Sequence, residues 1–213
     1  MMEQLSRRRM ICALAAGATV PGAVLLTTAA PAAAQPAVVA PVEQLVAALL
    51  RIMQAGTATP FEQRFQVMAP VIQRVFDLEA ILRASVGSAW NMMPPDQQDT
   101  LRSAFLRYSV ASYVNSFDTF NGQRFEVLPN ARPVGNGDQV VKTRIIPRSG
   151  TTHELDYVMR QVNEGWRIVD VLAEGSISRV AVQRSDFRRL LSRGGVAALA
   201  SSLREKYADL SGG

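Results

Sequence analysis

The sequence predicts an α+β fold with N-terminal helices, an antiparallel meander sheet of about four to five strands, and C-terminal helices. Two observations predict it. Apolar residues recur at helical spacing up to about residue 120 and again after residue 180, whereas between these regions the period of the pattern changes to two. Helices and strands that are grouped separately along a chain are typical of helices packed on one face of an antiparallel sheet.

Residues 1–34 have the pattern of an export signal. Arg7 to Arg9 precede an Ala-rich apolar stretch with no charged residue until Glu43, and the small-residue run that signal peptidases prefer ends at Ala34. We therefore expect a signal peptide that is cleaved after Ala34. The Ser-Arg-Arg start resembles a twin-arginine signal, but export by the Sec route stays open.

The composition of the expected mature chain excludes several kinds of site. Cys12 is the only cysteine and lies in the expected signal, which excludes disulfides, thiol catalysis and thiolate metal ligands. Removal of residues 1–34 leaves 20 basic and 17 acidic residues, so the net charge falls from +5 to +3. Nucleic-acid binding usually requires clustered Lys and Arg with interleaved aromatic residues. The arginines here are spread along the chain, and we expect no nucleic-acid partner.

A short Pro/Ala/Val-rich linker, residues 35–41, precedes a single domain that we expect over residues 42–213. The expected helices are 42–54, 61–75 with a break or kink at Pro70, a short helix capped by Asp77 that ends near Gly87, 95–120, 180–192, and a last helix after Gly194-Gly195. The expected strands are 123–128, 139–146, 154–162 and 166–172, with hairpin turns between them.

The long helix that begins near Pro95 has apolar residues on two sides. One stripe contains Leu101, Phe105, Tyr108 and Ser112, and a second, nearly opposite stripe contains Leu106, Val110, Tyr113 and Phe117. A helix that is apolar on two sides must be covered on two sides. This helix is therefore either a central core helix or one that packs on the body by one stripe and faces an apolar ligand by the other.

The residues that could carry catalysis are few. His153 is the only histidine, and without a second histidine or a cysteine it cannot build the usual zinc site. Asp156 and Asp170 could lie on neighbouring strands as a carboxylate pair. Each has an arginine nearby in the sequence, Arg160 and Arg167, so structural ion pairs are the simpler interpretation. We expect no metal and no cofactor.

Several stretches, in order along nearly the whole expected mature chain, resemble the MlaC or toluene-tolerance family and its HpnM-like, hopanoid-associated relatives. The matching stretches are Val75-Phe76-Asp77, Gly87-Ser88-Ala89-Trp90, Ala104-Phe105 with Tyr113, Tyr157-Val158-Met159, Gly165 to Val171, Gly175 to Ser178, Arg184 to Phe187, Gly194-Gly195 and Leu203 to Lys206. The chain differs from a typical member by its twin-arginine-like start and its Arg-rich, Lys-poor body.

The resemblance implies a nuclear-transport-factor-like fold with a deep apolar cavity. It implies a periplasmic carrier, not an enzyme, that takes phospholipid or a hopanoid-type lipid between the inner and outer membranes and so supports outer-membrane lipid asymmetry. The partners would be an inner-membrane ABC transporter complex and an outer-membrane lipoprotein complex. The expected lipid-binding residues are Phe105, Tyr108, Tyr113, Phe117, Tyr157, Met159, Val169 and Val171.

Two other functions remain open. A small hydrolase or isomerase could use the same cavity, with His153, Asp156 and Asp170 as its reactive groups. A non-lipid interaction module could instead dock a partner through the apolar stripe from Val196 to Leu210 on the last helix.

Overall fold

The computed structural model describes residues 37–212, so the expected export signal, residues 1–34, lies outside the described part. The elements, in chain order, are α1 (Ala40–Ala55), α2 (Phe61–Val75), α3 (Leu78–Val86), the 3-10 helix η1 (Gly87–Met92), α4 (Pro95–Ser116), β1 (Arg124–Val127), β2 (Arg132–Pro133), the 3-10 turn η2 (Gly135–Gly137), β3 (Gln139–Val141), β4 (Thr143–Ile146), β5 (His153–Val162), β6 (Gly165–Ala173), β7 (Ile177–Ser178) and α5 (Arg179–Ser211). The predicted α+β class and the order of helices and strands are confirmed.

The sheet is antiparallel throughout its strand pairs and centres on β5, which pairs with β6 on one side and with both β3 and β4 on the other. It has seven strands, more than the four to five predicted. The predicted strand 139–146 is two strands that are interrupted at Lys142, and β2 and β7 are pairs of residues too short to produce a periodic signal.

The helix boundaries follow local capping chemistry. Asp77 caps α3 as predicted, because its Oδ1 accepts a hydrogen bond from the backbone N–H of Ala80 at 2.9 Å. At α4, Pro95 occupies the first turn, where its missing N–H costs nothing. The alternative of a break at Pro70 is wrong, since α2 continues through this residue as one helix.

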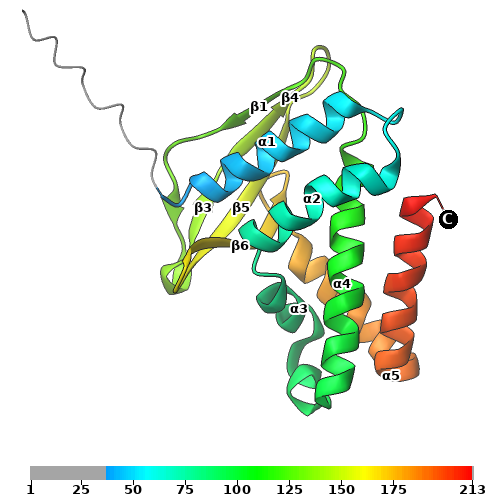
Figure 1. Cartoon of the computed structure of the whole chain (residues 1–213). Coiled ribbons are helices and arrows are strands. Elements are labelled where there is room, and N and C mark those ends of the chain that lie inside the picture. The colour runs from blue at the N-terminus through cyan, green and yellow to red at the C-terminus, as the bar shows by residue number, and fades with distance from the viewer. Residues whose placement is uncertain (1–36, 213) are drawn as a thin grey trace, which may run out of the picture. The chain divides into compact units, whose positions relative to one another are not determined.

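The predicted interruption at Gly194-Gly195 is confirmed, because both residues leave the helical conformation within α5. Gly195 has a φ of +61°, and a Cβ atom on Gly194 would lie only 2.9 Å from the Cβ of Ala198. Glycine is the residue that fits both positions. Figure 1 shows the result: the orange half of α5 leads away from the sheet, and the red half returns beside α4.

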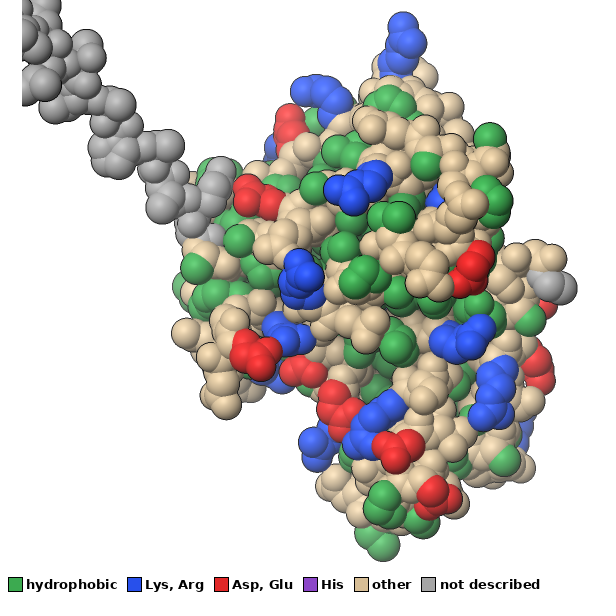
Figure 2. All heavy atoms as spheres, viewed as in Figure 1, with side chains coloured by type: hydrophobic (Ala, Val, Ile, Leu, Met, Phe, Trp, Pro, Cys, Tyr) green, Lys and Arg blue, Asp and Glu red, His purple; other side chains and the backbone are tan. Residues whose placement is uncertain are grey.

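The helices cover one face of the sheet, and α1, α2, α3 and α5 all contact β6. The junction between α2 and α3 is tied directly to the sheet, because the backbone N–H of Asp77 donates to the carbonyl of Ile168 at 2.9 Å. Figure 2 shows acidic and basic side chains interspersed with apolar ones on the face that carries α1 and α2. None of the helices between residues 37 and 212 is both long and apolar enough to span a bilayer.

Candidate functional site

A cavity of about 260 Å³ lies between α3, α4, the start of α5 and the strands β5 and β6. We call it the aromatic cavity. The longest part of its wall is one side of α4, formed by Phe105, Tyr108, Ser109, Ser112, Tyr113, Ser116 and Phe117. The other elements contribute Ile72, Phe76, Leu78 and Ile81 from the α2–α3 region, Leu155, Asp170, Val171 and Ala173 from the sheet, and Arg179, Val180 and Gln183 from α5.

Aromatic rings in contact form part of this wall. The ring of Tyr113 has its centroid 5.5 Å from that of Phe76 and stacks on Phe117 at 6.1 Å, with an angle of 12° between the planes. Phe117 in turn lies 6.0 Å from Phe125 of β1. Such pairs contribute about 0.5–1.5 kcal/mol each beyond their burial. The rings therefore form a continuous apolar surface from the α2–α3 junction to β1.

The sequence predicted the two-sided character of α4 but divided its residues wrongly between the sides. Tyr113 and Phe117 face the cavity together with Phe105 and Tyr108, although they were assigned to opposite stripes. Val110 is buried but does not line the cavity. The side of α4 that faces the cavity contains serines as well as aromatic residues, so it is broader than the stripes of apolar residues seen in the sequence. α4 thus packs on the body with one side and faces the aromatic cavity with the other.

Asp170 fixes the start of α5 at the wall of the cavity. Its carboxylate accepts hydrogen bonds from the backbone N–H of Val171 at 2.7 Å, from the backbone N–H of Val180 at 3.1 Å, and from the hydroxyl of Ser178. The Ser178 hydroxyl oxygen in turn accepts from the backbone N–H of Ala181, which caps the helix. Asp170 therefore joins the sheet to α5 without an arginine partner.

The expected arginine partners pair elsewhere, which corrects the predicted ion pairs. Arg160 pairs with Asp138 at 2.6 Å, and Arg167 pairs with Glu164 at 2.7 Å. Asp138 reaches Arg160 because β3 pairs with β5, whereas Glu164 lies only three residues before Arg167.

Two polar side chains of the lining, Tyr113 and Arg179, determine where charge lies along the cavity. Burial raises the pKa of the Tyr113 phenol well above its ordinary value, nearby Tyr157 adds to the rise, and Arg179 opposes it. Tyr113 is therefore neutral at physiological pH. Arg179 lines the cavity, is itself exposed, and forms no ion pair with any residue in the range 37–212. The positive charge lies at the mouth and the aromatic rings lie inside.

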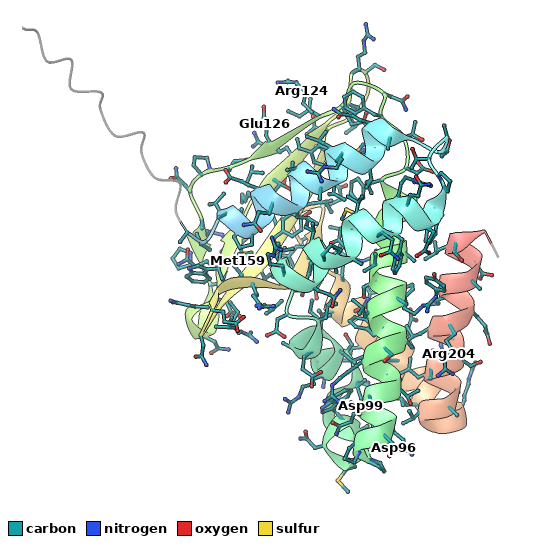
Figure 3. All side chains as sticks on the ribbon, in the orientation of Figure 1. Asp96, Asp99, Arg124, Glu126, Met159 and Arg204 are labelled. Carbon is teal, nitrogen blue, oxygen red and sulfur yellow. The ribbon has the colours of Figure 1, made fainter. Side chains whose placement is uncertain are left out.

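Five of the eight expected lipid-binding residues line the aromatic cavity, namely Phe105, Tyr108, Tyr113, Phe117 and Val171. The other three, Tyr157, Met159 and Val169, are buried but do not line it. Figure 3 places Met159 on the sheet in the region of α1 and α2. The sequence did not predict the lining residues Ser109, Ser116 and Gln183. Small polar residues within the aromatic side of a helix are the signal that could have identified the two serines.

The three residues of the alternative hydrolase or isomerase hypothesis, His153, Asp156 and Asp170, do not bond to one another in the structure. His153 is exposed, and its Nδ1 lies 3.2 Å from Glu174 Oε1. Asp156 is 2% exposed, and its Oδ1 has no hydrogen-bond partner among the described residues. Burial is the main cause that raises the pKa of Asp156. No hydrogen bond or ion pair within residues 37–212 links any two of His153, Asp156 and Asp170, and that part of the chain holds no group of three potential metal ligands.

The apolar stripe on the second half of α5 packs inside the chain. Leu199 and Leu203 are buried, and the ring of Tyr207 lies 6.4 Å from Phe61 and 6.0 Å from Phe65, with edge-on geometry in both pairs. These contacts occupy the surface that the interaction-module hypothesis needs for a partner.

This chain is similar to known proteins in both fold and sequence. The chain resembles the structure of a phospholipid-binding protein from Ralstonia solanacearum, which was determined in complex with a phospholipid. The two share 22% identity and a TM-score of 0.70, and the match covers 82% of this chain and 98% of the other. A search of curated proteins finds no significant match. The sequence model of the family described as MlaC protein matches residues 43–205, which is most of the chain. The chain belongs to the MlaC family.

Proposed function

We propose that this protein is a lipid carrier that holds the apolar part of a membrane lipid in the aromatic cavity and leaves the headgroup at the mouth. The observation that carries the proposal is the aromatic cavity itself, with rings inside and, at the opening, a cation that has no ion-pair partner within residues 37–212. Family membership and the phospholipid-binding protein of similar fold support it.

The free energy of lipid burial is consistent with a protein that carries a lipid without reacting with it. Each methylene group that leaves water for an apolar site contributes about 0.8 kcal/mol, so a chain of ordinary length is held strongly before the costs of binding are counted. Arg179 at the mouth supplies a cation for a lipid phosphate, and Asp170 is already bonded to α5. Family membership and these features support a carrier rather than an enzyme, and among the described residues His153, Asp156 and Asp170 share no hydrogen bond or ion pair.

The same proposal includes the setting of the carrier. Residues 1–34 would direct export to the periplasm, where the protein would exchange lipid with an inner-membrane ABC transporter complex and an outer-membrane lipoprotein complex. The cargo would be a phospholipid or a hopanoid-type lipid, both of which offer a long apolar body to the cavity.

Mass spectrometry of organic extracts tests the proposal. Protein that is purified gently from its native host should yield a stoichiometric lipid, and stripped protein should take up lipid from vesicles of phosphatidylglycerol and phosphatidylethanolamine. Addition of a hopanoid to the same vesicles would identify the preferred cargo. Protein that carries no lipid after purification and takes up none from any vesicle would exclude the carrier function.

A further inference from the structure

The positive charge of the chain is concentrated on the first half of α5. Residues 179–193, which we call the basic segment, contain five arginines and one acidic residue, Asp186, and so have a net charge of +4. The expected mature chain has a net charge of +3, so its other residues together have a net charge of −1. Although arginines occur along the whole chain, the net positive charge of the protein therefore comes from this one segment.

The arginines of the basic segment are exposed, and most of them have no acidic partner. Arg189 pairs with Asp186 at 2.8 Å. The other four form no ion pair with any residue between 37 and 212, and they are Arg179, Arg184, Arg188 and Arg193.

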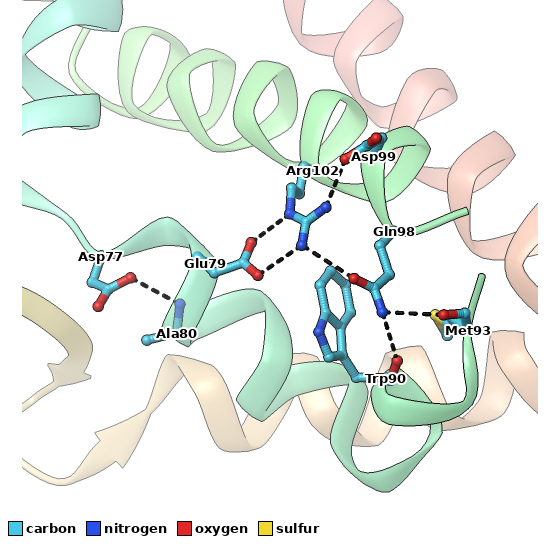
Figure 4. A network of polar contacts seen from close by, with 8 residues as sticks. All are labelled: Asp77, Glu79, Ala80, Trp90, Met93, Gln98, Asp99 and Arg102. Atoms are coloured by element: carbon cyan, nitrogen blue, oxygen red, sulfur yellow. Dashed lines mark hydrogen bonds and ion pairs between the residues drawn. The ribbon is translucent and has the colours of Figure 1, made fainter. Parts of the chain in front are cut away.

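Arg102 of α4 has the opposite arrangement. Its guanidinium donates to both carboxylate oxygens of Glu79, at 2.7 and 3.0 Å, and to Asp99 at 2.6 Å, as Figure 4 shows. A cation that is neutralised by neighbouring carboxylates adds little to the attraction of a further anion. The unpaired arginines of the basic segment, by contrast, keep their attraction for an anionic surface.

Exposed aliphatic side chains lie among these arginines. Val182 is 49% exposed, and Ile177, in the short strand directly before α5, is 54% exposed. Val182 follows Arg179 by three residues and precedes Arg189 by seven, so the three lie on one side of the helix. The surface therefore combines cations with single apolar side chains.

The basic segment begins at the mouth of the aromatic cavity. Arg179, Val180 and Gln183 belong to its first two turns and line the cavity. From there the segment leads away from the sheet as the orange half of α5 (Figure 1). A broad surface that contacts the segment therefore also meets the opening of the cavity.

The chemistry of the segment favours an anionic bilayer as its partner. The centre of a protein–protein interface is depleted of charged residues, whereas here the apolar side chains stand singly between arginines. Binding of single-stranded nucleic acid uses exposed aromatic rings, and Phe187, the only aromatic residue of the segment, is buried. Arginines with interspersed apolar side chains suit the anionic headgroup region of a membrane.

We propose that the basic segment docks the protein on the surface of an anionic membrane, with the mouth of the aromatic cavity toward the lipid. The use of this docking in lipid transfer rests on the lipid-carrier function proposed above. It adds the membrane itself to the partners of the carrier, because a lipid then enters or leaves the cavity where the basic segment meets the headgroups.

Charge reversal at the far end of the segment tests the docking without a change in the cavity wall. Arg188→Glu combined with Arg193→Glu lowers the net charge of the segment from +4 to 0, and neither residue lines the cavity. The matched control combines Arg51→Glu with Arg124→Glu, at exposed positions of α1 and β1 that form no ion pair with any described residue. Figure 3 places Arg124 on β1, away from α5. If the reversed protein does not fold by circular dichroism, Arg188→Gln with Arg193→Gln removes the two charges instead.

The measurement is co-sedimentation with sucrose-loaded vesicles of palmitoyl-oleoyl-phosphatidylglycerol, which is anionic, or of palmitoyl-oleoyl-phosphatidylcholine, which has no net charge. We expect wild type and control to bind the anionic vesicles at low salt and to leave them at about 1 M salt, where the Debye length falls to about 3 Å. The affinity of the Arg188→Glu, Arg193→Glu protein for these vesicles should be at least tenfold lower. Equal binding to both kinds of vesicle, or an equal loss in the control, would overturn the proposal.

Mass spectrometry of lipid extracted from the same preparations separates docking from carriage. Wild type that carries lipid but sediments with neither vesicle would overturn the docking alone and would indicate an acidic protein as the partner of the basic segment. Wild type that sediments with anionic vesicles but neither carries nor takes up lipid would support the docking surface and exclude the carrier function.

Discussion

Helices α1 and α2 pack against the sheet differently from α4 and the start of α5. On the α1–α2 side, aliphatic side chains such as Leu45, Leu49 and Ile52 are fully buried and fill the space. On the α4–α5 side, Tyr108, Tyr113 and Phe117 are only partly buried and surround a cavity. Both regions are apolar, yet one is closely packed and the other is hollow.

The difference arises from the alternation of side-chain sizes. On α4, the serines at 109, 112 and 116 lie between aromatic rings, so the rings cannot be covered from neighbouring positions of the helix. On α1, leucine, valine and isoleucine recur at helical spacing and are buried, and buried aliphatic side chains in protein cores are closely packed. Apolar content alone therefore does not predict a ligand cavity, whereas small polar residues within an aromatic helix face do. Four predictions test this contrast.

Truncation in the filled region should have the largest effect on stability. Leu49→Ala removes a fully buried side chain from α1 and leaves a cavity that the neighbours cannot close, so we expect the free energy of unfolding to fall by about 2–5 kcal/mol. Urea denaturation measures this change. Lipid binding per folded molecule should stay at the wild-type level. If Leu49→Ala lost as much lipid binding as Ser112→Trp, which fills the aromatic cavity, the two regions would not be separate.

Loss of the Asp170 carboxylate should loosen the cavity side. Asp170→Ala leaves the backbone N–H of Val180 and the Ser178 hydroxyl without their acceptor, and we expect a loss of about 1–3 kcal/mol. Hydrogen exchange should show the added opening in the first turns of α5. Hydrogen exchange at the α1 amides should increase only as far as the lower global stability requires. If α1 opened before the first turns of α5, the role assigned to Asp170 would be wrong.

A bulky side chain in the aromatic cavity should weaken lipid binding in protein that is still folded. Ser112→Trp places a large ring where the wall has a small residue, so the folded protein should bind lipid at least tenfold more weakly, a change of about 1.4 kcal/mol. Asn115→Trp, at an exposed position of α4 that does not line the cavity, serves as the control. A Ser112→Trp protein that binds lipid like the control would mean that the chains lie outside this cavity.

The smallest expected effect concerns pH. Burial raises the folded-state pKa of Asp156, while Lys142 and the backbone N–H of Thr143 partly oppose the rise. The neutral acid is thus favoured in the folded protein, so its stabilising contribution is present below the unfolded pKa of about 3.9 and is lost as the pH rises through the folded value. Asp156→Asn does not titrate and should gain stability relative to wild type between pH 4 and pH 7. Urea denaturation at both pH values checks this, and a constant difference would contradict it.

Local patterns predicted much of the fold. The cap at Asp77, the turn at Gly194-Gly195 and the order of helices and strands were all correct, because each depends on residues close together in the sequence. The interruption at Lys142 was not predicted, since it depends on how β3 and β4 share one edge of β5.

The cavity wall was predicted only in part. The aromatic residues of α4 were found from their character, but Tyr157 and Met159 on β5 were expected to line the cavity and instead lie in the core. Their position depends on which part of the sheet each helix covers, which is a tertiary property. For the same reason the partner of Arg160 was not Asp156 but Asp138, which a hairpin brings into reach.

The central claim is that the space between α4 and the sheet holds an acyl chain, whereas the space beneath α1 does not. A crystal structure of the protein loaded with phosphatidylglycerol that carries bromine on one acyl chain tests it most directly. We expect an anomalous bromine peak between Tyr113 of α4 and Val171 of β6. A peak beneath α1, or on the outer surface of the protein, would contradict it.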